Sequence, residues 1–422
     1  MRLPALASGL PTGASPLGWR CFQIGLLLLP SSALLASALF VVALVLGCRG
    51  RSPWWRDSCN RVLLVVATLM LLGTLRADRA DLAWAGLANW LPFFWGFWGF
   101  QPYVAAPPAR RRAALWLVAG TVPVILTGLG QMWAGWRGPW QLLGGLIIWH
   151  MSPGGEPEGR LSGLFDYANI AGSWLALVWP LALAALLQRG LSRGRRLTVL
   201  LIAAGLVAAL LLTDSRNAWG ALLLALPLVA GPASWLWLLP VLLLALLPVL
   251  VAVLPGVPSG WQEAARALVP EGIWGRLSDA KHAAERVPAS TRLGQWGVAL
   301  GLIGERPWLG WGAAAFTVLY PARTGQWHGH PHNLPIEMAV SFGVPAALLL
   351  VGMVVGLLGR SARRGMAGGA LFERAWWAAA LVLLSLHATD IPLYDSRLNI
   401  AGWILLAGLR GRQPAETRAG AP

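Results

Sequence analysis

Three histidines at alternate positions, His328, His330 and His332, stand just before a long apolar run that begins at Leu334. In an extended chain their side chains could converge on a metal ion, although the sequence offers no evident fourth ligand. One of them could instead act as a general base, because an unperturbed imidazole, with a pKa of about 6.5, can take a proton from a sugar hydroxyl near neutral pH. A third interpretation is that these histidines only cap the next helix.

A second candidate group is the short polar turn Thr213-Asp214-Ser215-Arg216-Asn217 between two apolar runs. Arg216 could be an arginine that reaches out of the membrane and pairs with Asp214. It could equally be a guanidinium fixed at the membrane edge, where it would hold a phosphate through two hydrogen bonds. Arg292 opens a predicted helix and Arg160 precedes one, and each on its own is typical of a solvated helix end.

A third group of polar residues flanks the turn before the last apolar run. An ionisable cluster at the membrane edge can be a structural ion-pair network or part of a site, and here we favour the structural interpretation. The group consists of His387, Asp390, Asp395 and Arg397.

The composition predicts an all-α polytopic membrane protein. The 422 residues are 57% hydrophobic and only 12% charged, whereas soluble proteins carry about 25% charged residues. Several soluble domains and a disordered chain are both excluded on this basis. The net charge of +16 does not indicate nucleic-acid binding, because the arginines are scattered between apolar runs and not gathered on one face. Cys21, Cys48 and Cys59 match no metal-binding spacing, and we interpret them as small buried residues.

Apolar runs predict about twelve transmembrane helices, since a span needs about 20 apolar residues. The proline at position 30 leaves open whether the first run is one kinked helix or a hairpin of two. The expected spans lie near residues 21–30, 31–47, 62–75, 82–104, 113–133, 166–187, 197–213, 217–231, 235–254, 334–358, 375–391 and 398–409.

Arginines mark one side of this arrangement. If the spans are right, five arginine-rich segments all lie on the same side, which the positive-inside rule makes cytoplasmic, together with both termini. The other side then receives most of the acidic residues and is where we expect chemistry. The arginines in question are Arg49, Arg51, Arg56 and Arg61; Arg110, Arg111 and Arg112; Arg189, Arg193, Arg195 and Arg196; Arg360, Arg363, Arg364 and Arg374; and Arg410, Arg412 and Arg418.

Three regions follow from this topology: an N-terminal transmembrane bundle (1–254), an external cap (255–333), and C-terminal transmembrane helices with a cytoplasmic tail (334–422). In the cap, short helices are expected over Gly260–Leu268 and Leu277–Val287. An amphipathic helix is expected over Arg292–Glu305, with an apolar stripe. That stripe comprises Leu293, Trp296, Leu300 and Ile303.

Four pieces of the chain, in this order, resemble the superfamily of O-antigen ligases and O-antigen polymerases, over residues 155–358. The pieces are Arg160-Leu-Ser-Gly-Leu-Phe before a span ending in Trp179-Pro180-Leu; Asp214-Ser-Arg216; Arg292 with Trp296 and Glu305-Arg-Pro-Trp-Leu-Gly-Trp-Gly312; and His332-Asn333-Leu-Pro-Ile-Glu337 entering a helix that contains Gly343.

The resemblance implies a membrane glycosyltransferase of the bacterial inner membrane. Such an enzyme moves a glycan from undecaprenyl pyrophosphate to an acceptor hydroxyl on the periplasmic face, in lipopolysaccharide biosynthesis for a ligase. It implies His332 as the catalytic base and no metal or other cofactor. It further implies Arg216, Arg292 and Arg160 as ligands of the pyrophosphate, supported by Asn333 and Asp214. We expect inversion at the anomeric carbon.

Other functions stay open. A polymerase of the same superfamily would share the chemistry and differ in its acceptor, a second carrier-linked glycan in place of the lipid A core. Some relatives in the superfamily are linked to inorganic carbon uptake, so a solute transporter is a further alternative, as is a structural envelope protein that binds partners through the cap. The expected partners are the lipid-linked donor, a glycolipid or glycan acceptor and membrane lipids, with no nucleic acid.

Overall fold

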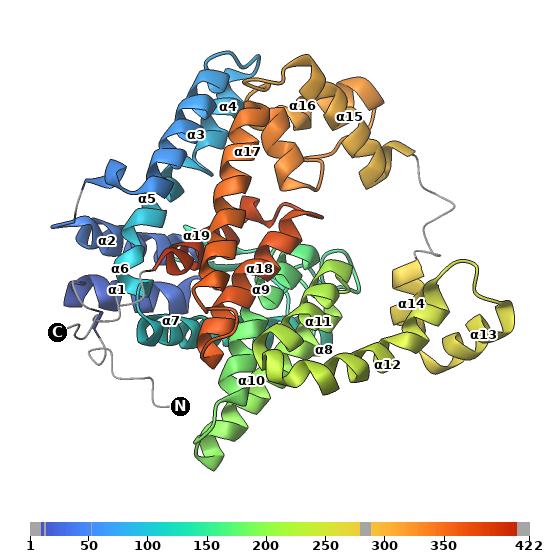
Figure 1. Ribbon diagram of the computed structural model, residues 1–422. Coiled ribbons are helices and arrows are strands. Elements are labelled where there is room, and N and C mark those ends of the chain that lie inside the picture. The colour runs from blue at the N-terminus through green and yellow to red at the C-terminus, as the bar shows by residue number, and fades with distance from the viewer. Residues whose placement is uncertain (1–9, 12–13, 52, 279–287, 412–422) are drawn as a thin grey trace, which may run out of the picture.

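The computed structural model describes residues 10–11, 14–51, 53–278 and 288–411. In this part of the chain the fold is almost entirely helical, as the sequence predicts (Figure 1). One small antiparallel sheet pairs β1 (Trp140–Leu142) with β2 (Ile147–Trp149). The expected helix over 277–287 lies largely outside the described residues, as do Arg412 and Arg418.

The first apolar run forms two helices and not one. α1 (Pro16–Leu28) and α2 (Ala33–Cys48) lie on either side of Pro30 and pack against each other. The hydroxyls of Ser15 and Ser32 each accept a hydrogen bond from a backbone N–H three residues later. These caps satisfy donors that have no partner within the helix.

The chain continues through a series of shorter helices. The apolar stretch 82–104, predicted as one span, is broken into three helices, because Pro92 and Pro102 each stand in the first turn of a new one. The helices of this part, after a 3₁₀ turn at Trp54–Arg56, are α3 (Ser58–Thr74), α4 (Ala80–Leu87), α5 (Leu91–Gly99), α6 (Gln101–Val104), α7 (Pro107–Gly120) and α8 (Val122–Trp133).

The buried centre of the molecule is α9 (Ala168–Leu187). In its most apolar stretch of 18 residues, 83% of the residues are buried inside the protein. It packs against α7, α10 (Arg193–Leu212), α11 (Arg216–Ala230) and α18 (Leu371–His387). This packing places the N-terminus of α11, where Arg216 is found, beside the centre of the bundle.

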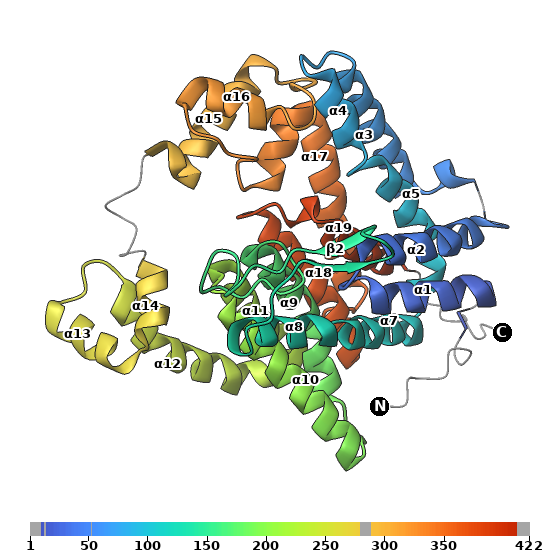
Figure 2. The same ribbon diagram turned by 180° about the vertical axis from the view of Figure 1, so that it is seen from behind.

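A 3₁₀ turn at Pro232–Ser234 leads into α12 (Trp235–Val253), which is apolar all round but almost wholly exposed. In the most apolar 18 residues of Pro232–Val253, only 6% of the residues are buried inside the protein. Such a helix is stable in lipid and not in water. In both views it extends away from the other helices and carries α13 (Ser259–Leu268) and α14 (Glu271–Ser278) at its far end (Figures 1 and 2).

The chain has the character of a multi-pass membrane protein. Five helices of the described residues are long and apolar enough to cross a membrane, and three shorter apolar helices accompany them. The count of about twelve spans and the external position of the cap remain predictions. The five are Pro107–Trp133, Ala168–Leu187, Arg193–Leu212, Pro232–Val253 and Leu334–Arg363; the three are Ala33–Cys48, Ser58–Thr74 and Arg216–Ala230.

The helix expected over Arg292–Glu305 is confirmed as α15, after a 3₁₀ turn at Pro288–Ser290. Of its expected apolar stripe, Leu293 is 76% and Leu300 61% exposed, whereas Trp296 and Ile303 are half-buried. Leu302 and Ile303 pack in one cluster with residues of α16 (Phe316–Thr324) and α17 (Leu334–Arg363). The packed face of α15 therefore overlaps the expected stripe only in part.

The long helix α17 is interrupted at Gly343, where φ is 83° and ψ is 162°. The loop after α15 enters this break. The N–H groups of Trp311 and Gly312 donate to the carbonyls of Val340 and Ser341, and the N–H of Val344 donates to the carbonyl of Pro307. The segment 305–312, one of the pieces named in the sequence analysis, thus joins α15 to α17 (Figure 1). Arg292 lies at the start of α15, and His332 lies just before α17.

Replacing Gly343 with alanine is expected to destabilise the protein strongly. A Cβ atom there would lie 2.2 Å from the carbonyl oxygen of Trp308, and the backbone conformation is one that only glycine adopts readily. We expect a loss of about 3 kcal/mol or more, seen as a lower melting temperature of the purified protein. Gly352→Ala in the same helix is the control: nothing lies within 4 Å of its Cβ position, so its melting temperature should be unchanged or slightly higher. Equal melting temperatures for the two variants would contradict this account.

The last two helices of the described residues are α18 and α19. α18 ends at His387, a 3₁₀ turn spans Pro392–Tyr394, and α19 (Ser396–Arg410) follows. The carboxylate of Asp395 caps α19 and forms an ion pair of 2.5 Å with Arg397. These two residues are structural, as expected for the polar group at this turn, but Asp390 in the same turn has a different partner.

Candidate functional site

Two of the residues proposed from the sequence have a strained backbone. φ is 52° at His332 and 50° at Asp214, in the left-handed region where residues other than glycine are strained by about 1–3 kcal/mol. His332 stands immediately before Asn333, the cap of α17, and Asp214 stands immediately before Ser215, the N-cap position of α11. Strain of this kind persists only where the surroundings impose it, and it is concentrated at functional sites.

The imidazole of His332 lies against the carboxylate of Asp390. Its Nδ1 is 3.0 Å from Oδ1 of Asp390, which comes from the turn after α18. The side chain of His332 is 29% exposed, whereas that of Asp390 is 9% exposed. A buried carboxylate therefore orients a histidine whose own side chain is partly accessible from the surface of the protein. A general base must be accessible in this way to reach the hydroxyl of a substrate.

The Asp390 carboxylate is held in its charged form. Burial by itself raises the pKa of this carboxyl, but the hydrogen bond to His332, the nearby imidazoles and the N–H of Ile391 bring its pKa below the ordinary value. A carboxylate at this position can stabilise a proton taken up by His332.

Three hydrogen bonds made by two side chains fix the loop that carries His332. Asn333 accepts the N–H of Ile336 through its side-chain oxygen and donates through Nδ2 to the carbonyl of Ala388, at 3.0 Å each. Trp296 of α15 donates through Nε1 to the carbonyl of Pro331 at 2.8 Å. Asn333 thus holds the loop against the turn after α18, and Trp296 ties α15 directly to the loop.

His330 completes this first group. Its Nδ1 accepts the N–H of His332 at 3.2 Å, and the two rings meet edge to face at 4.4 Å. Burial, followed by the neighbouring His332, lowers the pKa of His330 to about 4. His330 is therefore neutral near pH 7, and its nitrogen, that of His332 and the oxygen of Asp390 all lie within 4.8 Å of one another.

Arg292 belongs to the same neighbourhood. It is the first residue of α15, whose cap is Thr291, and its positive charge contributes to lowering the pKa of His330. Its half-buried side chain stands at a helix end joined to the His332 loop through Trp296. His328 is turned toward Tyr320 instead, with ring centroids 5.5 Å apart.

A second group surrounds the turn between α10 and α11. The guanidinium of Arg160 donates to the carbonyl of Thr213 at 2.9 Å and to Oδ1 of Asn169 at 2.6 Å. The N–H of Leu161 donates to the carbonyl of Leu212. Burial, and then the charge of Arg276, lower the pKa of Arg160. The Arg160 segment thus satisfies carbonyls at the end of α10 and places its charge beside Asp214.

The sequence did not indicate Arg276, although it occupies this second group. From α14 it forms an ion pair of 3.1 Å with the carboxylate of Asp214 and also donates to the backbone carbonyl of Asp214. Arg216, the first residue of α11, follows two positions after Asp214. Three arginines from three segments therefore gather around one short turn.

The two groups are connected through the turn that contains Asp390. At one end of this turn Asp390 contacts His332. At the other end Arg397 donates to the carbonyl of Leu164 at 2.8 Å and stacks on Phe165, only a few residues after Arg160. The hydrogen bonds of Arg160 lie within the second group and that of the His332 ring lies within the first, and this turn contacts both groups.

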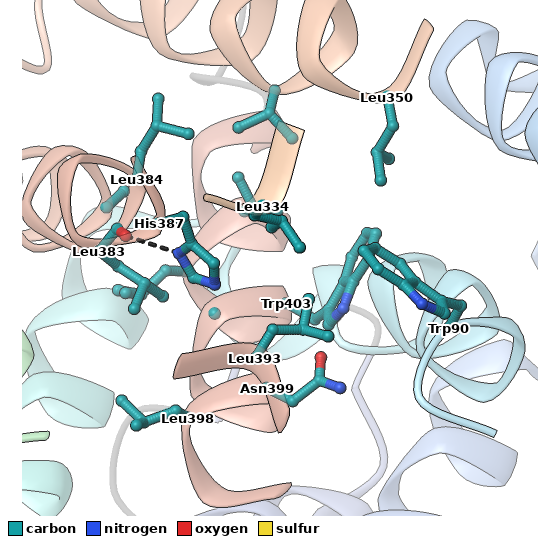
Figure 3. Close-up of a pocket in the computed structure, with 15 residues that line it drawn as sticks. Trp90, Leu334, Leu350, Leu383, Leu384, His387, Leu393, Leu398, Asn399 and Trp403 are labelled. Carbon is teal, nitrogen blue, oxygen red and sulfur yellow. Dashed lines mark hydrogen bonds between the residues drawn. The ribbon is translucent and has the colours of Figure 1, made fainter. Parts of the chain in front are cut away.

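An apolar pocket lies next to the first group (Figure 3). It is formed by α17, α18 and α19 with Trp90, and Leu334, two residues after His332, lines it. Within it, Nε2 of His387 and Oδ1 of Asn399 have no hydrogen-bond partner among the described residues, while Nδ1 of His387 lies 2.7 Å from the carbonyl of Leu383. Further lining residues are Leu350, Leu384, Leu393, Leu398 and Trp403.

Comparison with known proteins identifies part of the chain. Residues 197–351 match the family model of the O-Antigen ligase. This segment is similar to the O-antigen ligase domain. No curated protein matches the chain.

The O-antigen ligase domain runs from α10 into α17 and supports an activity of the ligase or polymerase type. It includes three of the pieces that carried the resemblance, with Asp214, Arg216, Arg292, His332 and Asn333. The Arg160 piece precedes it, and Asp390 follows it. These two residues nevertheless contact the domain through Thr213 and His332.

Proposed function

We propose that this protein transfers a glycan from undecaprenyl pyrophosphate to an acceptor hydroxyl, such as one on the lipid A core, at the periplasmic face of the bacterial inner membrane. The observation that carries the proposal is the contact between His332, inside the O-antigen ligase domain, and the buried carboxylate of Asp390. The proposal includes both termini in the cytoplasm and the cap 255–333 in the periplasm.

In the proposed reaction His332 takes the proton of the acceptor hydroxyl as its oxygen attacks the anomeric carbon. The bond between that carbon and the pyrophosphate oxygen breaks on the opposite side, so the configuration inverts and lipid pyrophosphate leaves as an anion. Asp390 orients His332 and stabilises the imidazolium that forms. These steps require no metal or other cofactor.

The leaving pyrophosphate needs positive charge at the membrane edge. Arg216, Arg292 and Arg160 would supply it, with Asp214 holding the turn between α10 and α11 in place. Preorganised guanidinium groups stabilise a developing anion more strongly in the transition state than in the ground state. The apolar pocket beside Leu334 would accommodate part of the polyprenyl chain, which needs contact with apolar side chains only.

A deletion strain tests the function and separates it from the alternatives. Loss of polymer from the lipid A core, with accumulation of carrier-linked polymer, is the result expected of a ligase. Accumulation of single carrier-linked repeats would make the protein a polymerase and overturn the proposed acceptor. Unchanged glycans with altered solute uptake would point to a transporter and overturn the proposal as a whole. The wild-type gene, and not an allele encoding His332→Ala, should restore the glycans.

A further inference from the structure

The cluster of His330, His332 and Asp390 offers more than a base and its partner. Three groups that commonly bind transition metals come from two separate segments and converge, with one ligand atom of each within 4.8 Å of the others. Two of them, Nδ1 of His332 and Oδ1 of Asp390, are already 3.0 Å apart. In a tetrahedral zinc site with bonds of 2.0–2.1 Å, neighbouring ligand atoms are about 3.3 Å apart.

Several features suit this cluster to a borderline metal ion and not to Mg²⁺ or Ca²⁺. Two imidazole nitrogens and one carboxylate oxygen form a ligand set typical of Zn²⁺, and three protein ligands leave the fourth position open. The N–H of His332 donates to Nδ1 of His330 at 3.2 Å and so holds the His330 ring beside that of His332. A metal ion that takes the Nδ1 lone pair of His330 would replace this hydrogen bond. The carboxylate of Asp390 supplies negative charge that offsets the neighbouring Arg292.

We propose that His330, His332 and Asp390 form an inhibitory site for a transition metal ion of the Zn²⁺ class, which blocks the proposed glycan transfer reversibly. The inference rests on the proposed function of His332 as a base, but metal binding itself can be measured without it. In the proposed transfer His330 moves no proton, and its contact with His332 is the backbone N–H that it accepts.

Inhibition follows from the number of lone pairs on imidazole. A neutral imidazole has one ring nitrogen with a free lone pair, and the other nitrogen carries the proton. If the metal takes the lone pair of His332, no nitrogen of that ring can accept the proton of the acceptor hydroxyl. The same ion would also withdraw the Asp390 carboxylate from its role in orienting the ring. Metal binding and proton removal are therefore mutually exclusive at His332.

Metal binding is tested on the purified full-length protein after treatment with EDTA. Co²⁺ is added as a spectroscopic probe and its visible d–d absorption recorded, and Zn²⁺ affinity is measured by competition with a chromophoric chelator. The wild type should bind one equivalent. His330→Ala should bind more weakly by about tenfold or more, and so should Asp390→Asn as a second variant. His150→Ala is the matched control, because His150 lies in an exposed loop, and its affinity should equal that of the wild type.

Transfer is then measured with the metal-free protein and with added Zn²⁺. Zn²⁺ should inhibit the wild type and His150→Ala, EDTA should restore both, and His330→Ala should keep in Zn²⁺ the rate that it shows in EDTA, whatever that rate is. Absence of metal binding by the wild type, or equal inhibition of His330→Ala and the wild type, would overturn the inhibitory site. A wild type that is inactive even in EDTA but binds Co²⁺ through His330 would instead contradict the proposed function and leave the metal site standing.

Discussion

Replacing His332 with alanine is expected to lower the rate of glycan transfer by about 10²–10⁴-fold, the usual contribution of a positioned general base. The side chain is open to the outside while its partner Asp390 is buried, so truncation removes the proton acceptor and leaves the helices around it packed. The melting temperature should therefore change little. The decrease should appear in kcat, with the KM for the lipid-linked donor nearly unchanged, because the imidazole acts on the acceptor hydroxyl.

Asp390→Asn tests the partner of His332 in the same pair. Asparagine keeps the shape of the side chain but removes the charge that stabilises the imidazolium, so kcat should fall by about 10²-fold or more. His150→Ala, in an exposed loop far along the chain, is the control and should retain wild-type activity. Full activity of His332→Ala in a metal-free assay would show that the base lies elsewhere.

Local signals explain the part of the fold that the sequence could predict. The α15 boundaries, Arg292–Glu305, follow from a threonine cap at one end and Pro307 beyond the other. The start of α17 at Leu334 follows from the Asn333 cap and Pro335 in its first turn. Such signals lie within a few residues of the boundary they define, so a single sequence is enough to detect them.

Contacts between distant residues explain what could not be predicted. Asp390 lies 58 positions from His332, and Arg276 lies 62 positions from Asp214. The sequence marked Asp390 only as one member of a polar group at the last turn and gave no sign of Arg276. Only the packing of α14, α17 and α18 makes these pairs, and no spacing along the chain encodes it.

The break in α17 has the same origin. Gly343 reads as an ordinary helix residue, and its backbone departs from the helix only because the loop containing Trp308 approaches within contact of it. α15 illustrates the converse: its apolar stripe fits the helical period, but tertiary contacts decide that Ile303 is packed while Leu293 and Leu300 are exposed.

Arginine substitutions are expected to produce the other large loss of activity. Arg292→Ala and Arg216→Ala should each lower transfer by about 10²–10³-fold, the usual result of removing one preorganised group that stabilises a developing anion. Arg292→Lys and Arg216→Lys should recover only part of this activity, because an ammonium group keeps the charge but loses the two parallel hydrogen bonds to a phosphate. The measurement is single-turnover transfer from a lipid-pyrophosphate donor by purified variants.

The cap provides a matched control in Arg323, an arginine of α16 whose side chain is 35% exposed and forms an ion pair with Glu305. Exposed pairs contribute little to stability, so Arg323→Ala should transfer at nearly the wild-type rate. If it lost as much activity as Arg292→Ala, the effect would reflect the general charge of the cap and not binding of the leaving group.

Arg160→Ala has a different expected result. Its guanidinium also donates to the carbonyl of Thr213, so lower thermal stability should accompany its loss of activity. Lower activity without lower stability at Arg292, and both together at Arg160, would separate an arginine that binds the pyrophosphate from one that also builds the turn.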